Sequence, residues 1–482
     1  MEIKDYGIHW FRRDLKISGN LALSNNLRAH GGRVLGLFCF DHLFLGRPDF
    51  SINRFQFFLE TLVALKKELQ KQGGDLLVLD VGPKSAYENI FGLLREHQIP
   101  PPHTVSWNRD YEPFATKRDA EMLKWFQEKG VKVVTERDHL LIEPHEIFKG
   151  DDPTAHYQVF TPFKRRWIEK FKTEEIQKRL IAPPAIPFQL NWSTLFNGKC
   201  FLKDHLELFL ENNRKRVTIP IPLAGESEGK KLIALFRPKV KDYGVNRDIP
   251  SLEGTSRFSI FYKNGSLTAS QVIREMKLNH NGEWNEGEEK FVSELIWREF
   301  YYYILGRFPR VENEPFLVKY KKIKWGNNMR WFQAWKDGQT GFPIIDAGMR
   351  QLNETGWMHN RVRMIVASFL TKDLHIDWRW GEKYFMEKLL DGDLAANNGG
   401  WQWAASTGCD PQPYFRVFNP YLQSKRFDPQ GVYLKKYLPE LRDLTSQSIH
   451  EPPQDLMTSG YPAPIVDHSV QRLEAIALYK GN

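Results

Sequence analysis

The first 135 residues alternate between short apolar runs and longer amphipathic stretches. The apolar runs are rich in β-branched and aromatic residues, which favour strands, and they cover residues 8–11, 33–40, 75–81, 104–107 and 131–134. The stretches between them have helical spacing and cover residues 20–30, 53–72, 85–98 and 114–129. This order predicts an α/β domain with a doubly wound parallel sheet, in which Asn20 caps the first helix.

Residues 136–220 do not continue this rhythm, because prolines interrupt them repeatedly. We expect a connector that wraps over the surface of a domain. From about residue 224 the apolar spacing becomes helical, most clearly over residues 290–305, from Pro343 onward and over residues 358–374. The sequence therefore predicts three parts: an α/β domain (1–135), an interdomain connector (136–220) and an all-α domain (221–482).

Composition narrows the class of protein. The chain has 482 residues, of which 41% are hydrophobic and 26% charged, a balance typical of soluble globular proteins with more than one domain. It has no apolar run long enough to cross a bilayer and no secretory signal, so we expect a cytoplasmic protein that does not bind membranes. The three cysteines, Cys39, Cys200 and Cys409, lie far apart, which argues against a metal site or a disulfide framework.

The formal net charge of +9 permits phosphate binding, although an ordinary basic surface explains it equally well. The chain has no G-x-x-x-x-G-K-[ST] motif, no H-E-x-x-H and no G-x-G-x-x-G after the first strand. Because the N-terminal domain lacks a phosphate loop, we expect the chemistry in the helical half.

Two stretches of the helical half offer groups for phosphate. The segment EGTSR (253–257), followed by Ser259, places hydroxyl groups near a possible helix start, where phosphate can bind. By itself an ordinary capped turn explains this segment better. Tyr243 and Arg247 in DYGVNRD form the other stretch, for which a loop with a solvated arginine is the simpler explanation.

A third stretch, ELIWRE (294–299), places Glu294, Trp297 and Arg298 on one helix face, because they stand at i, i+3 and i+4. A carboxylate, an indole and a guanidinium beside apolar neighbours are suited to a polar pocket. A surface salt bridge with Trp297 in the core is an equally good interpretation.

The fourth stretch is GWMHNRVRM (356–364), in which helical spacing places Asn360, Arg363 and Met364 on one side and Arg361 roughly opposite Arg363. Asparagine offers a donor and an acceptor, and the arginines suit phosphate or carboxylate partners. Two solvated arginines are the alternative, which their apolar surroundings disfavour.

The fifth stretch, DGDLAANNGGWQW (391–403), has two acids around a glycine and then small residues that allow close backbone approach. It lacks the further acids of a calcium loop. Hydrogen bonding of Asp391 and Asp393 to a flavin fits better than a metal, and Asn397 is placed to tune flavin N5.

With these motifs the chain resembles the photolyase/cryptochrome family, and the resemblance extends from HWFRRDLKISGNLAL to YPAPIVDH. WMHNRVRM is the version found in class I cyclobutane pyrimidine dimer photolyases, whereas similar (6-4) enzymes carry histidine in place of Asn360. Plant cryptochromes carry aspartate in place of Asn397. The resemblance therefore implies a lyase that repairs cyclobutane pyrimidine dimers.

The resemblance also implies that the helical domain holds a bent FAD, with an arginine–aspartate pair near N5. A family aromatic residue is replaced here by Phe291, which keeps stacking but loses an indole N–H. The residues implied to hold FAD are Tyr243, Thr255, Ser256, Arg257, Ser259, Arg298, Arg361, Arg363, Asp391, Asp393 and Asn397.

The implied substrate is damaged DNA, single- or double-stranded, bound by a monomer near the nucleoid through salt-sensitive phosphate contacts. A dimer flipped into the pocket would lie between Trp297 and Trp403 and accept one electron from light-excited reduced FAD, which later returns. The residues implied to contact DNA or the dimer are Arg247, Glu294, Trp297, Asn360, Met364 and Trp403.

Two further sets of residues follow from the resemblance. Trp401, Trp378 and Trp325 match a tryptophan chain that photoreduces oxidised flavin, although core packing would explain each of them without the resemblance. Asn108, Asp110 and Glu112 lie where the family binds an antenna, either a folate (methenyltetrahydrofolate) or an 8-hydroxy-deazaflavin.

Two other functions compete with repair. A cryptochrome would sense blue light without repairing DNA, and a flavin redox enzyme would turn over with NAD(P)H in darkness. No nicotinamide motif supports the second.

Overall fold

The computed structural model describes residues 5–150, 152, 154–199, 201–278, 282–453 and 460–481. The chain forms two compact units that alternate along the sequence. The α/β unit comprises residues 1–147, 166–238 and 256–283, and the helical unit comprises residues 148–165, 239–255 and 284–482. These ranges differ from the predicted parts, because most of the predicted connector belongs to the α/β unit.

The α/β unit contains a five-stranded parallel sheet with the order β3-β2-β1-β4-β5. Four strands are buried along their whole length, as expected for a parallel sheet covered on both faces, and only β5 is partly exposed. The strands are β1 (Gly7–Phe11), β2 (Val34–Cys39), β3 (Leu76–Leu79), β4 (Thr104–Asn108) and β5 (Lys132–Glu136).

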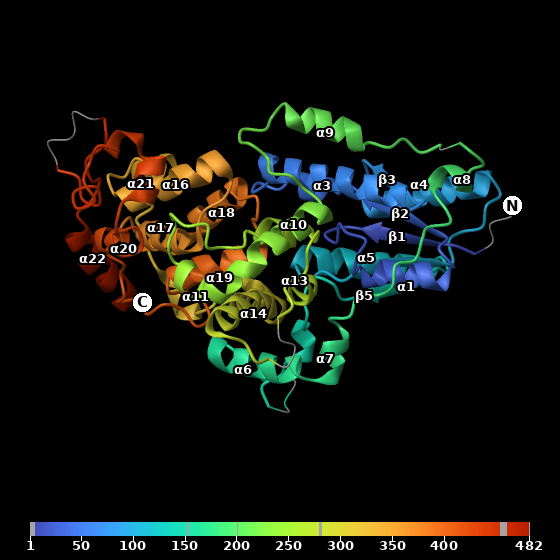
Figure 1. The fold of residues 1–482 in the computed structure, drawn as a ribbon, viewed down its shortest axis with the longest axis horizontal. Helices are drawn as coiled ribbons and strands as arrows, with labels where there is room; N and C mark the ends of the chain where they lie inside the picture. Colours follow the sequence, from blue (N-terminus) through green and yellow to red (C-terminus); the bar gives the residue numbers. More distant parts are fainter. Residues whose placement is uncertain are drawn as a thin grey trace. The chain divides into compact units, whose positions relative to one another are not determined.

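Helices cover both faces of this sheet (Figure 1), and a separate hydrophobic cluster lies under each layer. Helices α1 (Leu21–Ala29) and α3 (Ile52–Lys71) contribute to one cluster, and α4 (Pro83–Glu96) and α5 (Pro113–Glu128) contribute to the other. The predicted cap is confirmed, since the Asn20 side chain accepts a hydrogen bond from Leu23 N at 3.1 Å. The doubly wound sheet is therefore confirmed.

The predicted connector contains several short helices. Its prolines delimit these helices: Pro144 is the first residue of η1, and Pro162 lies in the first turn of α6, where no helical N–H is lost. Leu206 and Leu210 join the core of the α/β unit, so this part covers the sheet. The helices are η1 (Pro144–Glu146), α6 (Phe160–Phe171), α7 (Glu174–Lys178), α8 (Trp192–Leu195) and α9 (Leu206–Arg214).

Four further helices and one 3-10 helix belong wholly or mainly to the α/β unit or lie at its border. They are α2 (His42–Leu45), α10 (Glu226–Phe236), η2 (Arg237–Asp242), α12 (Ser259–Asn264) and α13 (Ala269–Glu275).

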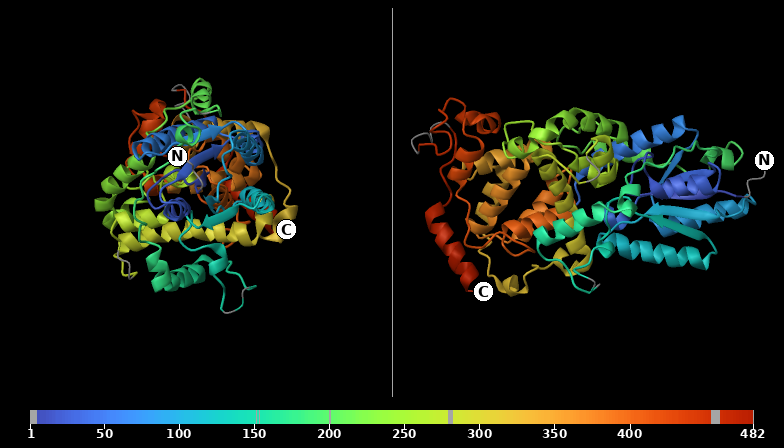
Figure 2. Two further views of the ribbon diagram at one scale, coloured as in Figure 1. Left: turned by 90° about the vertical axis from the view of Figure 1, so that its right-hand side faces the viewer. Right: turned by 60° about the horizontal axis from the view of Figure 1, so that its bottom comes forward.

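The helical unit consists of helices packed against one another, drawn mostly in yellow, orange and red in Figure 2. They are α11 (Tyr243–Asn246), α14 (Glu286–Arg307), η3 (Pro309–Glu312), η4 (Val318–Lys322), α15 (Met329–Asp337), α16 (Pro343–Thr355), α17 (Asn360–Lys372), α18 (Trp378–Lys388), α19 (Leu394–Ala404), α20 (Pro420–Phe427), α21 (Val432–Tyr437), η5 (Pro439–Leu441) and α22 (His468–Lys480). The predicted all-α character of this half is confirmed. None of the helices in the described ranges has the length and apolarity to cross a bilayer.

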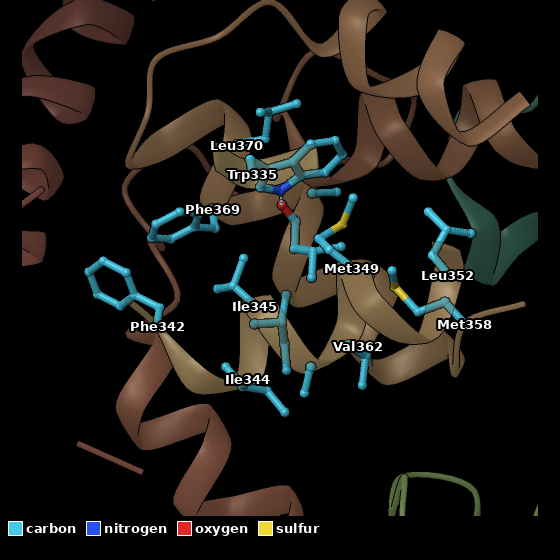
Figure 3. Packing of buried hydrophobic residues seen from close by; sticks show 14 of the residues in the cluster. Trp335, Phe342, Ile344, Ile345, Met349, Leu352, Met358, Val362, Phe369 and Leu370 are labelled. Atoms are coloured by element: carbon cyan, nitrogen blue, oxygen red, sulfur yellow. Dashed lines mark hydrogen bonds between the residues drawn. The ribbon is translucent and has the colours of Figure 1, made fainter. Parts of the chain in front are cut away.

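A large hydrophobic cluster holds α15, α16 and α17 together (Figure 3). Trp335 is fully buried, and its indole N–H donates to Val366 O at 3.2 Å, so the polar edge of the ring is satisfied inside the core. A Cβ at Gly348 would lie 2.5 Å from Val362 Cγ1, which shows why only glycine allows α16 and α17 to approach so closely here. This rigid core positions the N-terminus of α17, where the predicted site residues begin.

Candidate active site

Helix α14 carries three of the predicted site residues on one face. Asn285 and Glu288 form a capping box that starts the helix ahead of them. Glu294, Trp297 and Arg298 are each partly exposed, whereas the intervening Leu295 and Ile296 are buried. The helix therefore presents a carboxylate, an indole and a guanidinium side by side at its more open face.

Glu294 belongs to a chain of alternating charges. Its Oε1 accepts a hydrogen bond from Arg247 Nη1 at 2.5 Å, and Arg247 Nε lies 3.7 Å from Asp248 Oδ1. The same Asp248 oxygen accepts from Arg361 Nη2 at 2.8 Å. Burial alone would lower the pKa of Arg247, but the Glu294 carboxylate and other nearby groups outweigh it and raise that pKa. The chain of charges holds the Glu294 carboxylate in one orientation.

The two arginines near the N-terminus of α17 bind different acids. His359 caps the helix, and its buried Nδ1 accepts from Arg361 N at 3.2 Å. Arg361 binds Asp248, whereas Arg363 Nη2 donates to Asp391 Oδ2 at 2.9 Å and Arg363 Nε donates to Met358 O at 2.8 Å. Burial and three nearby guanidinium groups lower the pKa of His359 to about 4. The imidazole is therefore neutral at pH 7.

Two buried carboxylates precede α19. Asp391 pairs with Arg363, and Asp393 both accepts from the Tyr302 hydroxyl at 2.5 Å and caps α19 through Ala396 N. One turn further, Asn397 Nδ2 donates to Glu382 O at 2.9 Å, which fixes the side-chain amide. The arrangement holds two acids and an amide along the start of one helix.

The predicted lesion residues are partly exposed aromatic and polar groups. The Trp297 ring stacks on Phe160 with centroids 3.7 Å apart and planes 7° apart, so one of its faces is covered. Trp403 and Met364 are half-buried, and Asn360 is exposed. Arg361 Nη1 lies 3.7 Å from the Met364 sulfur, which connects that side chain to the charged network.

The three tryptophans of the predicted electron path lie in or against the core of the helical unit. Trp401 and Trp378 are both 2% exposed, and Trp325 packs on the same cluster while remaining partly exposed. Trp401 also contacts Phe385 and Trp335, with ring centroids 5.0 and 6.1 Å away. Trp325 is therefore the most exposed of the three, and core packing explains the two buried rings as well.

The predicted phosphate-binding residues belong to both units. Tyr243 and Thr255 lie in the helical unit, whereas Ser256, Arg257 and Ser259 lie in the α/β unit. Tyr243 is buried against Phe291, with an edge-to-face contact of 5.5 Å between centroids. Ser259 is the first residue of α12, so the hydroxyl groups do lie near a helix start, as the sequence predicts.

The predicted antenna residues all lie in the α/β unit, but their side chains are engaged there. Asn108 is 5% exposed, and its Nδ2 donates to Asp14 Oδ2 at 2.6 Å and Asn20 Oδ1 at 2.7 Å. Glu112 accepts from Arg13 Nη1 at 2.7 Å and Lys263 Nζ at 3.1 Å. Asp110 accepts from the Tyr111 N–H at 2.7 Å. The antenna assignment stays a prediction.

Four residues that sequence reasoning missed complete the site: Asp248, Tyr302, His359 and Glu382. Three of them had a local signal. Tyr302 follows Arg298 at i+4 on α14, and Asp248 follows Arg247 directly. His359 stands just before α17 and could have been predicted as its cap, whereas Glu382 has no signal of this kind.

One group of side chains outside this site has the spacing of metal ligands. Asp5, His30 and His103 in the α/β unit place possible ligand atoms within 4.8 Å of one another. Arg33 Nη2 lies 3.2 Å from the Asp5 carboxylate, so a positive charge already occupies its surroundings. This charge disfavours a cation, and the prediction that the protein needs no metal stays a prediction.

Sequence comparison places these residues in a known family. The family description "DNA photolyase" matches residues 7–185, and "FAD binding domain of DNA photolyase" matches residues 291–481. Proteins called deoxyribodipyrimidine photo-lyase from Vibrio cholerae, Salmonella typhimurium and Escherichia coli are 39%, 37% and 36% identical to this chain. In each case the match covers 98% of both proteins.

Solved structures of photolyases are similar to this chain as well. A class III photolyase from Agrobacterium tumefaciens is similar with a TM-score of 0.81 and 34% identity, covering 99% of this chain and 98% of that one. An archaeal photolyase from Sulfolobus tokodaii, which contains two FAD molecules, has a TM-score of 0.82 and 31% identity over 99% of this chain and 100% of its own. The predicted fold, FAD-binding domain and enzyme class are therefore confirmed, and this chain belongs to the DNA photolyase family.

Proposed function

We propose that this protein uses light to repair cyclobutane pyrimidine dimers in DNA. The observation that carries the proposal is the Glu294–Arg247 pair on the open face of α14, beside the partly exposed Trp297. This arrangement offers an oriented carboxylate and an aromatic surface next to each other. The names of the relatives support the same reaction, since they are deoxyribodipyrimidine photo-lyases.

The helical unit fits a flavin nucleotide. Asp391 and Asp393 are buried carboxylates held by Arg363 and Tyr302, and such groups accept hydrogen bonds from ring N–H and ribityl hydroxyl groups. When bound, FAD supplies the light-excited electron donor of the reaction. We assign the phosphate groups to Arg298 and Arg361, since guanidinium groups suit oxyanions.

Asn397 has a defined part in this proposal. Its amide nitrogen donates to Glu382 O, so its carbonyl oxygen is directed elsewhere and can accept from a flavin N–H. The Arg363–Asp391 pair would lie beside the same ring edge. Together these groups would set the polarity around N5 without any chemical change of their own.

The lesion would bind at the partly exposed aromatic side chains. Phe160 covers one face of Trp297 and keeps the indole rigid, and a base would stack on the other face. Met364 and Trp403 would enclose the dimer, and Asn360 would meet its polar edge. Photolyases as a class flip the damaged base out of the helix, and poor pairing of the lesion reduces the free energy that this step requires.

Glu294 would orient the dimer through a hydrogen bond. Because Arg247 binds Oε1, the second carboxylate oxygen can accept from a base N–H. Arg247 would also attract the DNA phosphates, and this contact predicts affinity that falls as salt rises.

The decisive experiment follows repair of an oligonucleotide that carries one thymine dimer, in light and in darkness. We expect repair in light alone, and we expect Glu294→Gln to reduce the repair rate at least tenfold, since it weakens a charge-assisted hydrogen bond of about 1.5–3 kcal/mol. Glu354→Gln, at an exposed position of α16, is the matched control and should repair normally.

Other results would point to the competing functions. Retention of FAD without repair in light would identify a cryptochrome, and steady turnover with NAD(P)H in darkness would identify a flavin redox enzyme. We also propose a second chromophore near Asn108, Asp110 and Glu112, and an absorption spectrum of the purified protein would distinguish a folate from a deazaflavin.

A further inference from the structure

A small polar pocket lies in the α/β unit, next to the end of β5 and the start of α1. Arg137 and Asp138 directly follow β5, and Gly19 and Leu21 flank the cap of α1. Arg179 and Arg274 line the same pocket from two other segments of this unit. The pocket thus collects three guanidinium groups, although it uses none of the residues assigned to flavin, lesion or antenna.

Most of the charges around the pocket are already balanced. Arg179 Nη1 donates to Glu146 Oε2 at 2.8 Å, and its Nη2 is paired with Glu175 as well. Arg274 contacts Leu180 O at 3.3 Å and the Glu275 carboxylate at 3.4 Å. Neither arginine therefore needs a further anion.

Asp138 is likewise neutralised, because its carboxylate accepts from Lys16 Nζ at 2.5 Å and both side chains are almost fully buried. This acid still attracts the guanidinium of Arg137, but its hydrogen-bonded partner is Lys16 and not Arg137.

Arg137 is the exception. It is only 9% exposed, and no described residue forms a hydrogen bond or ion pair with its guanidinium. Burial and the neighbouring Arg179 lower the pKa of Arg137 to about 10, although the carboxylates of Asp138, Glu146 and Glu143 act against this shift from a distance. A buried charge without a hydrogen-bonded partner is unfavourable, so the surroundings favour an added negative group.

We propose that this pocket binds a small oxyanion, a phosphate or a carboxylate group, through Arg137. The planar guanidinium offers two parallel N–H groups, a geometry that matches both kinds of oxyanion. Leu21, the first residue of the nine-residue helix α1, lines the same pocket, so the positive end of the helix dipole contributes.

The other walls indicate what the oxyanion is attached to. Ile181, Ala182 and Pro183 form an apolar side of the pocket, opposite in character to the arginines. The pocket is small, so only the anionic group of a ligand can enter it, and a less polar body would stay outside against these apolar residues.

Titration calorimetry on the FAD-loaded protein without DNA tests this proposal. Inorganic phosphate and acetate are the probes, added separately at constant ionic strength. We expect the wild-type protein to bind at least one of them, and Arg137→Gln to weaken that binding by roughly tenfold or more. Arg216→Gln, at an exposed position of the same unit, is the matched control and should bind as the wild type does.

The affinities of the wild-type protein for phosphate and for acetate decide between a phosphate and a carboxylate ligand. Arg137→Lys keeps the charge but loses the paired donors, and it should bind with intermediate affinity, which gives a second test if Arg137→Gln folds poorly. The proposal is overturned if the wild type binds neither anion, or if Arg137→Gln and Arg137→Lys both bind like the wild type.

Discussion

The Arg363–Asp391 ion pair should respond unequally to the loss of either partner. The Asp391 side chain is 3% exposed, whereas that of Arg363 is 24% exposed. Replacing Arg363 by glutamine leaves a buried carboxylate without its guanidinium. Replacing Asp391 by asparagine leaves an arginine that still donates to Met358 O and still reaches water. The arginine substitution should therefore be the more damaging one.

The size of the difference follows from burial. Removing one partner of a fully buried pair costs about 3–5 kcal/mol, and the partial exposure of Arg363 reduces this to about 2–4 kcal/mol for Arg363→Gln. For Asp391→Asn we expect about 1 kcal/mol, because hydrogen bonds to the amide replace part of the interaction. The double variant should resemble Asp391→Asn alone, so the coupling energy should equal the loss expected for Arg363→Gln, about 2–4 kcal/mol.

The free energies should be measured by hydrogen exchange of amides in α17 and α19, in protein without FAD. A local method is needed because two compact units do not unfold in one step. Lys383→Gln is the control, since the ion pair of Lys383 with Glu387 is 3.9 Å long and exposed. We expect this variant to lose less than about 0.5 kcal/mol of stability. Equal losses in the two single variants, or a larger loss in Asp391→Asn, would refute the argument from burial.

Three other predictions can be tested independently. Trp378→Phe keeps the buried packing but removes an oxidisable indole, so photoreduction of oxidised flavin should fall at least tenfold while repair by chemically reduced enzyme persists; normal photoreduction, measured by flavin absorbance, would exclude Trp378 from the path. His359 has a pKa of about 4 when folded, below the unfolded value of about 6.5, so the unfolded chain binds a proton first and stability should fall by at most about 3 kcal/mol as pH drops from 6.5 to 4. The His359→Asn variant keeps a helix cap and should lose this pH dependence. The unfolding free energy should be measured in urea at several pH values, and a variant whose free energy changes with pH as the wild type's does would contradict the assignment. Gly265→Ala would place a Cβ 1.8 Å from Arg13 O at a φ of +72°, so thermal unfolding of the α/β unit should show a loss of at least about 2 kcal/mol, and an unchanged Tm would show that the backbone can adjust.

Secondary structure was predictable where it depends on local spacing. The predicted helix over residues 114–129 is observed as Pro113–Glu128, and the predicted helix over 290–305 is part of Glu286–Arg307. These helices are amphipathic or buried, and one face of each must meet a core whatever the rest of the fold is. The short helices among the prolines of residues 136–220 were missed, because they are too short to show a period.

The candidate site was predictable only in its parts. The motifs identify Glu294, Arg247 and Trp297, but nothing local shows that Arg247 binds Glu294 or that Phe160 covers Trp297. These partners are separated by 47 residues in the first case, and by more than a hundred in the second. For Asn108 the family resemblance implied a ligand contact. In the structure its side-chain amide donates to two residues inside the α/β unit.

The sequence by itself determined the order of strands and helices, the family and the types of chemical group available. Only the tertiary structure decided which charges pair with one another, which face of Trp297 is covered, and that the buried Arg137 has no hydrogen-bonded acid among the described residues. The reason is physical: periodicity and capping act over a few residues along the chain, whereas burial and ion pairing depend on distances that folding creates between remote segments.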